Sequence, residues 1–393
     1  VNKIKKISKN NILDIEFAID KYNKVFILQA RPVVIPKNKK IISRKTYLNL
    51  MLKLEKKISK LQEKNYDLLG NTNCFGVMPD WNPAEIIGTK PKPLSLSLYK
   101  ELITDHIWSK NRSIYGFKSL EAHHLMTVFY GTPFIDVRVD FNSWLPESLN
   151  KKTSNKLINF YLKKLKKNKY LHDKVEFEIL FTCFTLSTED KLKKELKSFN
   201  KKEIIEIKKS LIEINRIAFF NSEKELVKLK KLKLQQSKLE SSNIYSLNKI
   251  YYLIEDCKKY GTLPFAGLAR CGFIAIDLLN SFVEKKILTQ EEKNKFLNTI
   301  DGIATNINKD NSNKTKSNFL KKYGHLRPNT YDITSLNYRE GYSRYFDNTD
   351  KKKLHKKQTF IFSNLQVSKI SRFLRNNKLN INSEKLIKFI KSS

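Results

Sequence analysis

The stretch from Pro264 to Val283 is the most hydrophobic part of the chain, and it constrains the fold more than any other segment. Arg270 and Asp277 interrupt it, and each would cost about 2.5 to 3.5 kcal/mol at the centre of a membrane helix. We therefore expect a buried helix in a water-soluble domain, with no membrane span. Since the two charged residues are seven positions apart, they can share one face of that helix.

Apolar residues spaced three and four apart recur through most of the chain after residue 94, which predicts a predominantly helical domain. Helices are expected at 94–115, 120–130, 155–170, 201–240 and in the tail at 363–393. Capping signals at Ser187 and Thr289 predict two more helix starts. Alternating or β-branched segments predict strands at 134–141 and 174–186, and a polar run predicts a loop at 306–317.

The N-terminal part has a different pattern. Residues 13–20 and 25–32 are apolar or alternating and flank a turn-like link, which predicts a β-hairpin. A lysine-rich amphipathic helix is expected within 36–66, followed by an ordered Pro- and Trp-rich loop at 73–93. The fold class is therefore α+β, and the expected divisions are 1–36, 37–93, 94–362 and 363–393.

Charge composition raises the question of an anionic partner. Lysine and arginine number 76 against 39 acidic residues, giving a net charge of +37. Only 11 of the 76 are arginine, the residue that pairs bidentately with phosphates and bases. We interpret most of the charge as lysine on solvated helix faces, so nucleic acid is disfavoured as a partner.

Four cysteines are widely spaced, at positions 74, 183, 257 and 271, without a C-x-x-C pair. This spacing argues against a zinc site and a disulfide framework, and it favours a reducing cytoplasmic location. The first residue is Val1, which suggests a fragment or a processed product.

Register can be predicted for the hairpin. If Asp20 and Val25 close its loop, Glu16 lies opposite Gln29, and Asp14 lies opposite Arg31. Carboxylate and carboxamide oxygens are ligands suited to magnesium, and an adjacent arginine can neutralise a polyphosphate. The opposite face would carry five core side chains, Ile15, Phe17, Ile19, Phe26 and Leu28. A simple solvated polar face is the competing interpretation.

The hairpin segments Asp14-Ile-Glu-Phe-Ala-Ile and Val25-Phe-Ile-Leu-Gln-Ala-Arg-Pro resemble the closing hairpin of the ATP-grasp domain in the phosphoenolpyruvate synthase and pyruvate phosphate dikinase family. This resemblance implies that Glu16 and Gln29 hold Mg²⁺, and that Arg31 contacts the phosphates of ATP. The resemblance covers only part of the family's domain arrangement, because the chain has neither a Gly-rich phosphate loop nor the Thr-Ser/Cys-His motif of the carrier domain. The long helical region resembles that of rifampicin phosphotransferase-like members, in which a helical substrate domain lies between the ATP-grasp domain and the phosphohistidine domain.

Two further segments resemble sequence motifs of uncharacterised members of that family. The first is Phe75 to Gly88, for which an aromatic-anchored interdomain loop is the favoured interpretation. The second is Tyr323 to Asp332, in which Asn329 replaces an expected glycine. His325 and Arg327 could bind an anionic substrate or meet a phosphohistidine domain, and a structural histidine in a turn is equally consistent with the sequence.

Two other arginines are candidates for substrate binding. Arg138 lies between Asp136 and Asp140 on one face of an expected strand, so a structural ion pair competes with substrate contact. Arg270 belongs to the hydrophobic helix described above. The adjacent His123 and His124 would point to different sides of a helix, which makes a poor metal site.

Together, these features predict a fragment of an ATP-dependent phosphotransferase. It would use ATP and Mg²⁺ and transfer phosphate through a carrier histidine to pyruvate or another small acceptor. The rest of the ATP-grasp domain and the phosphohistidine domain would be missing partners from the same protein, so the isolated chain should be inactive. The alternative is a noncatalytic lysine-rich module that binds nucleic acid or acidic surfaces, and a degenerate scaffold is a third possibility.

Overall fold

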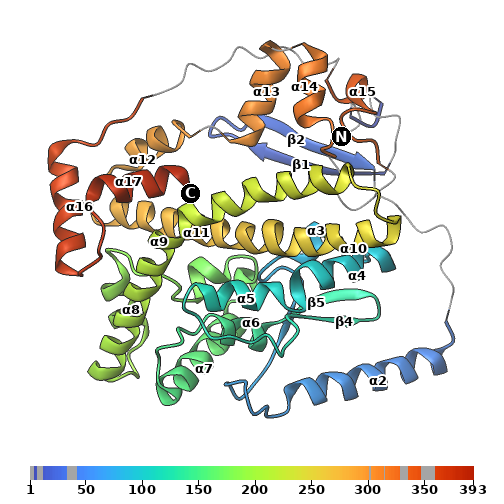
Figure 1. Cartoon of the computed structure of the whole chain (residues 1–393). Helices are drawn as coiled ribbons and strands as arrows, with labels where there is room; N and C mark the ends of the chain where they lie inside the picture. The colour runs from blue at the N-terminus through green and yellow to red at the C-terminus, as the bar shows by residue number, and fades with distance from the viewer. Residues whose placement is uncertain are drawn as a thin grey trace. The chain divides into compact units, whose positions relative to one another are not determined.

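The computed structural model describes residues 4–6, 12–32, 42–300, 302–313, 315–327, 335–346 and 359–393. The chain divides into two compact units, Val1–Lys60 and Leu61–Ser393. Helices dominate, and two small antiparallel sheets complete an α+β fold, as the sequence predicts (Figure 1). The finer division at residues 36, 93 and 362 stays a prediction.

The first unit contains the predicted hairpin, β1 (Leu13–Ile19) and β2 (Val25–Pro32). Glu16 is paired with Gln29 and Asp14 with Arg31, which confirms the predicted register at this end. A bulge follows Glu16 and shifts the pairing by one residue, so Phe17 lies opposite Ile27. The side chain of Asp20 fixes the turn by accepting hydrogen bonds from the backbone N–H groups of residues 22 and 24.

The predicted core face of the hairpin is wrong for the described part of its unit. Phe17 is 58% exposed and Leu28 is 67% exposed, because the described residues of this unit place no second layer over the two strands. The unit continues into α2 (Arg44–Gln62), which confirms the predicted basic helix and has no buried residue. The whole of the core described below therefore belongs to the second unit.

A three-stranded sheet in the second unit has the order β3-β5-β4, from Phe75–Gly76, Thr132–Asp136 and Met126–Phe129. β4 and β5 are joined by Tyr130 and Gly131, which both have positive φ angles, as a two-residue hairpin turn requires. The predicted helix at 120–130 is therefore wrong. The predicted strand at 134–141 is half right, because it ends at Asp136, whose side chain caps the next helix.

Short helices and helical turns make up most of the chain around this sheet and on to residue 195, and of these α3 and α6 contact β5. In chain order they are α3 (Pro83–Ile86), α4 (Pro93–Tyr99), the π-helical turn η1 (Lys100–Thr104), α5 (Ile107–Ile114), α6 (Val137–Ser143), α7 (Lys151–Lys167), the 3-10 turn η2 (Lys169–Leu171), the π-helical turn η3 (Val175–Ile179) and α8 (Thr188–Glu195). Ser187 does precede α8 as predicted, although its side chain makes no capping hydrogen bond.

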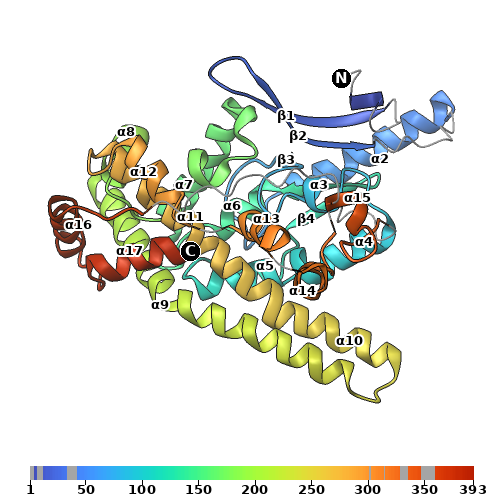
Figure 2. The same ribbon diagram turned by 90° about the horizontal axis from the view of Figure 1, so that it is seen from above.

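Two long helical elements form the centre of the second unit. The first is α9 (Lys201–Glu240), a single helix with a capping box at Asn200. The second runs continuously through α10 (Ser246–Asp256), the π-helical turn η4 (Cys257–Thr262) and α11 (Leu263–Glu284). They lie side by side in both views (Figures 1 and 2). Residues 246–284 are long and apolar enough to cross a membrane, but just over half of the apolar window is buried within the protein.

The predicted strand at 174–186 is wrong. Its first part forms η3, and residues 180–185 run without a strand partner. Side chains satisfy the backbone instead: the Tyr161 hydroxyl accepts from the Phe181 N–H, and the Asn215 carboxamide bonds both the N–H and the C=O of Phe184. β-branched and aromatic residues suit a half-buried extended chain, whether or not a second strand is present.

The C-terminal part is helical. It contains α12 (Gln290–Leu297), α13 (Ile303–Asn313), α14 (Lys316–Tyr323), α15 (Tyr342–Phe346), α16 (Asn364–Asn376) and α17 (Ser383–Ser392). The capping box at Thr289 and the helical tail are confirmed. The predicted loop at 306–317 is wrong, because most of it belongs to α13, whose Asp310 accepts hydrogen bonds from Lys322 and Tyr323 of α14.

The main hydrophobic core lies where α9 and α11 meet α7, η3, α16 and α17. A smaller cluster links the three-stranded sheet to α4 and α5. Helices α9 and α11 approach each other closely. A Cβ at Gly267 of α11 would lie 3.0 Å from Cγ of Glu225 in α9 and 2.6 Å from the Tyr115 hydroxyl. This packing fixes the helices that line the pocket described next.

Candidate functional site

A pocket of about 360 Å³ lies between the loop before α3, helix α5, the end of α6, the turn η3 and helix α11, all within the second unit. α11 contributes Phe265, Ala269, Arg270 and Phe273, which the helical repeat places on one face. Six of the twenty lining residues are aromatic and seven are charged, so apolar surface and charge meet in one concave site.

The loop Asp80-Trp81-Asn82 forms one wall and has an unusual backbone. All three residues have positive φ angles, at 34°, 53° and 28°, although none is glycine. Tyr99 donates a hydrogen bond to the Trp81 carbonyl, and the Asn82 side chain caps α3, so surrounding contacts hold the conformation. Such conformations cost of order 1–3 kcal/mol each and often occur at functional sites.

Asp80 and Arg112 form an ion pair inside the pocket. Arg112 Nη2 donates to Asp80 Oδ2 at 2.5 Å, and both side chains are more than nine-tenths buried. The guanidinium also lies over the indole ring of Trp144, 3.1 Å from the ring centroid. The positive charge of Arg112 is thus neutralised by Asp80 and oriented by an aromatic face.

Arg270 is different, because it is buried and forms no ion pair within the described residues, although Glu176 and Asp277 are near enough for its charge to oppose the rise in their pKa values that burial causes. Its side chain is held at one end, where Nη2 donates to the backbone oxygen of Thr182 at 2.9 Å and to the hydroxyl at 3.0 Å. Nε and Nη1 are buried and have no hydrogen-bond partner, and no ion pair of Arg270 occurs in the described ranges. The guanidinium also lies 5.0 Å from the Trp144 ring centroid, and its two unbonded N–H groups leave it able to gain from an anion that approaches them.

Glu176 from η3 brings a second unusual group to the pocket. Its Oε2 atom is buried without a hydrogen-bond partner. Burial, together with the negative charge of Asp80, raises the pKa of Glu176 to about 7, although Arg112 and Arg270 act in the opposite direction. Near neutral pH, this carboxyl group can therefore both accept and release a proton.

Asp140 orients Trp144, which lines the pocket. Its Oδ1 accepts a hydrogen bond of 3.1 Å from Nε1 of Trp144, which fixes the indole ring under Arg112. Burial raises the pKa of Asp140 well above its usual value, and its Oδ2 is buried without a partner. Trp108 also lines the pocket, and its Nε1 is buried without an acceptor.

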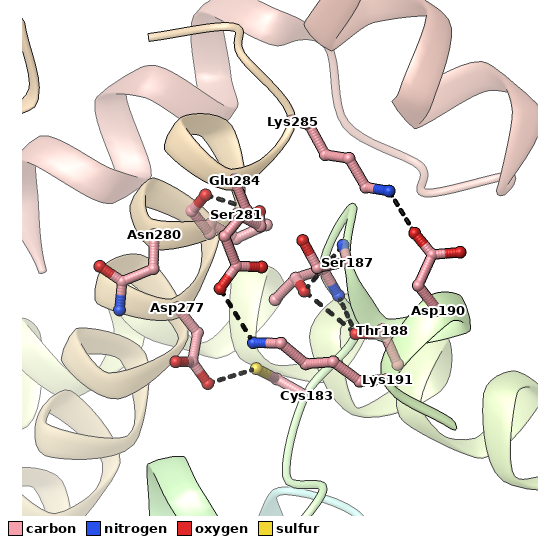
Figure 3. Close-up of polar contacts among 12 residues, drawn as sticks. Cys183, Ser187, Thr188, Asp190, Lys191, Asp277, Asn280, Ser281, Glu284 and Lys285 are labelled. Carbon is pink, nitrogen blue, oxygen red and sulfur yellow. Dashed lines mark hydrogen bonds and ion pairs between the residues drawn. The ribbon is translucent and has the colours of Figure 1, made fainter. Parts of the chain in front are cut away.

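A polar junction holds the segment that anchors Arg270. Cys183, next to Thr182, donates from its thiol to Asp277 of α11 at 3.3 Å. Lys191 of α8 pairs with Glu284 at 3.2 Å, and Lys285 pairs with Asp190 (Figure 3). The predicted shared face of Arg270 and Asp277 is therefore confirmed, since both contact the same extended segment.

Arg138 lies away from the pocket. The predicted strand face with Asp136 and Asp140 is wrong, because Arg138 and Asp140 belong to helix α6. The Arg138 guanidinium donates to the carbonyl oxygens of Leu61 and Glu63, at the end of α2, at 2.8 and 3.0 Å. Arg138 thus satisfies helix-terminal carbonyls and has a structural role.

His325 and Arg327 also lie apart from this pocket. His325 is exposed in the turn after α14, and Arg327 donates to the carbonyl oxygen of Ser335. Asn329 and Asp332 fall outside the described residues. His123 and His124 face different acids, Asp67 and Asp105, at 3.6 and 3.2 Å.

The hairpin places two of its predicted ligands together. Glu16 and Gln29 are directly opposite, so their oxygens can supply two of the six that Mg²⁺ requires, and the donor set fits the ion. Arg31 lies opposite Asp14 in the backbone pairing, but its side chain is outside the described part. The residues that can be described contain no group of three or more His, Cys, Asp or Glu suited to a metal.

Sequence reasoning therefore identified one charged residue of the pocket as a substrate candidate, Arg270, and missed Asp80, Arg112 and Glu176. These residues come from segments as much as 190 positions apart, and no periodicity connects them. The one available signal was the Pro79-Asp80-Trp81-Asn82-Pro83 run, which the sequence already marked as constrained. No family model matches the chain, no curated protein is significantly similar to it, and no solved structure matches its fold significantly.

Proposed function

We propose that this chain is part of an ATP-dependent phosphotransferase of the phosphoenolpyruvate synthase and pyruvate phosphate dikinase type. Phosphate from ATP would pass through a carrier histidine on another domain to pyruvate or another small acceptor. The remaining ATP-grasp and phosphohistidine domains would be supplied by further chain of the same protein. We also propose a cytoplasmic location, which the four free cysteines favour.

One observation carries this proposal: the hairpin register places Glu16 beside Gln29 and Asp14 beside Arg31. Magnesium bound there would neutralise charge on the phosphates of ATP. The exposed apolar side chains on both faces of the hairpin also support the proposal, because an isolated two-stranded hairpin is at best marginally stable in water. A larger sheet, as in an ATP-grasp domain, would cover them.

The pocket in the second unit is the proposed acceptor site. Arg270 would bind an anionic group of the acceptor, and Glu176 would accept the proton of a hydroxyl that receives the phosphoryl group. A carboxyl group with a pKa near neutrality is suited to this role. In the intact protein, the carrier domain would bring phosphate from the hairpin end to this pocket.

The test uses the protein encoded by the gene extended beyond both ends of this chain. We expect Mg²⁺-dependent ATP consumption with formation of an acid-labile phosphohistidine, and no such activity from the 393-residue chain alone. Glu16→Gln should lower the rate at least tenfold, whereas Glu55→Gln, an exposed carboxylate of α2, should not change it. A gene that ends at Ser393, or a product without phosphohistidine, would refute the proposal.

A second candidate function rests on a basic groove beside α7. The groove has a volume of about 740 Å³, and five lysines line it, at positions 152, 156, 163, 166 and 167. Of these five lysines, Lys156 alone forms an ion pair within the described part of the chain, with Glu203. The groove could therefore bind a polyanion such as nucleic acid without catalysis.

Salt dependence tests this second function. If nucleic acid binds in the groove, the logarithm of its affinity should fall linearly with the logarithm of salt concentration. The double variant Lys163→Gln with Lys167→Gln should reduce that slope by about two. Lys369→Gln on α16 serves as the control. A slope that does not change in the double variant would exclude the groove as the binding surface.

A further inference from the structure

The unpaired charge of Arg270 defines what the pocket lacks. Its side chain is 3% exposed, and Thr182 satisfies only Nη2, so Nε and Nη1 remain without acceptors. Arg112, the other arginine of the pocket, is already neutralised by Asp80. A ligand that supplies one negative charge would therefore complete the site. We propose that the pocket binds an aromatic monocarboxylate, with its carboxylate on Arg270 and its ring among the tryptophan and phenylalanine side chains.

The volume and lining of the pocket argue for an apolar body attached to the carboxylate. About 360 Å³ is several times the space that a three-carbon acid such as pyruvate would fill. Its walls include Trp81, Trp144, Phe265 and Phe273. The Trp81 and Phe265 rings already approach each other with centroids 6.0 Å apart, which leaves aromatic faces and edges available to a flat ligand.

Neighbouring carboxylates argue for a single negative charge on the ligand. Four acidic side chains line the pocket, Asp80, Glu85, Asp173 and Glu176, against three basic ones, Arg112, Lys174 and Arg270. A phosphate dianion would be attracted by Arg270 and the exposed Lys174, and repelled by the acids, which outnumber the bases. A monocarboxylate needs one cation and brings half the charge, so it suits this environment better.

The inference depends on the proposed function in one respect, that the bound acid would be the phosphoryl acceptor of the intact protein. Binding requires neither ATP nor a carrier histidine. A full-length protein that binds the acid but forms no phosphohistidine would refute the proposed function and leave the binding inference intact. Phosphohistidine formation without binding of the acid would refute the binding inference alone.

The chain offers a direct assay. It has three tryptophans, and all of them line this pocket, so its intrinsic tryptophan fluorescence reports on this site alone. The probes are 3-phenylpropionate, its neutral amide, 2-phenylethyl phosphate and pyruvate, titrated into the whole chain with excitation at 295 nm. We expect 3-phenylpropionate to bind at least tenfold more tightly than each of the other three. Equal affinities for acid and amide, or tighter binding of the phosphate, would overturn the proposal.

Variants assign the charge recognition to one residue. Arg270→Gln should abolish the preference for the acid over its amide, and Arg270→Lys should retain part of it. Arg372→Gln, on the exposed face of α16, is the matched control and should bind like the parent chain. If Arg270→Gln fails to fold, Ala269→Phe tests the same site by filling it, and binding of the acid should be lost. Binding that persists in folded Ala269→Phe would refute the proposal.

Discussion

At the residue scale, the pocket concentrates groups whose charge depends on their surroundings. Glu176 faces Asp80 of the preceding loop, Arg112 of α5, and Arg270 and Asp277 of α11. Because burial and Asp80 outweigh the two arginines, the folded protein binds the Glu176 proton more tightly than the unfolded chain does. This residue should therefore link stability to pH.

Glu176→Gln tests that link. Since the pKa of Glu176 is raised from 4.5 to about 7, the folded state is favoured at low pH, and this contribution is lost as pH rises from about 4.5 through 7. The parent chain should lose up to about 3 kcal/mol from Glu176 over that window, and the variant should lose correspondingly less, because only the raised pKa values of other buried acids such as Asp140 persist in it. Urea unfolding at pH 5 and pH 8 measures the difference. Glu178→Gln, exposed two residues away, is the control; equal pH profiles for parent and Glu176→Gln would contradict the prediction.

The Asp80–Arg112 ion pair should be costly to break from one side. Arg112→Met leaves a buried carboxylate without its cation, which typically destabilises a protein by about 3–5 kcal/mol. The double variant that adds Asp80→Leu should recover most of this loss, because neither charge then remains. Urea unfolding of the single and double variants provides the measurement. Lys295→Met, which breaks an exposed pair with Glu291, should cost less than about 1 kcal/mol.

At the scale of elements, the extended segment 180–185 depends on side chains for its backbone hydrogen bonds. Asn215→Leu would leave the N–H and C=O of Phe184 without partners inside the core. We expect a loss of about 2–4 kcal/mol, against about 1 kcal/mol for Asn200→Ala, which removes only the cap of the same helix. Thermal and urea unfolding compare the two; similar losses would show that the segment finds other partners.

Sequence patterns predicted the elements with a strong period and missed those that depend on distant contacts. α9, the α11 helix, the hairpin register up to Glu16 and the helices of the tail at 363–393 follow from local spacing and caps. α6 was mistaken for a strand because all of its residues are buried, which removes the helical period from its sequence. The segment 180–185 has strand-like composition without a neighbouring strand, and no local signal distinguishes the two cases.

The site was predictable only in part, for a related reason. Arg270 stood out because a charge inside an apolar helix needs an explanation. Trp144 and Glu176 did not stand out, because each is ordinary in its own segment and becomes unusual only where tertiary packing removes water from it. Arg138 looked equally promising by the same criterion, yet its Nη1 and Nη2 groups donate to backbone carbonyls of residues 61–63, and only its Nε is buried without an acceptor in the described structure.

At the scale of the whole molecule, the two units differ in whether they contain a hydrophobic core. Both hydrophobic clusters belong to the second unit, and none of their residues lies within 1–60. A chain of residues 61–393 should therefore fold and unfold at a temperature within a few degrees of the complete chain. Calorimetry and circular dichroism measure this, and a shorter chain that lacks a cooperative transition would show that the first unit is required.

The close approach at Gly267 has a mechanical consequence. The Tyr115 hydroxyl and the Glu225 side chain lie within 3.0 Å of the place that a Cβ at Gly267 would occupy, so α11 packs closely against α9 and against the residue that ends α5. Sliding of these helices therefore requires both side chains to move. The wall that carries Arg112 and Arg270 therefore behaves as a rigid frame. Any opening that admits a ligand has to come from the loop at residues 80–82 or from the turn η3, which face this frame across the pocket. Amide hydrogens of α11 near Gly267 should accordingly exchange with solvent only when the entire unit unfolds.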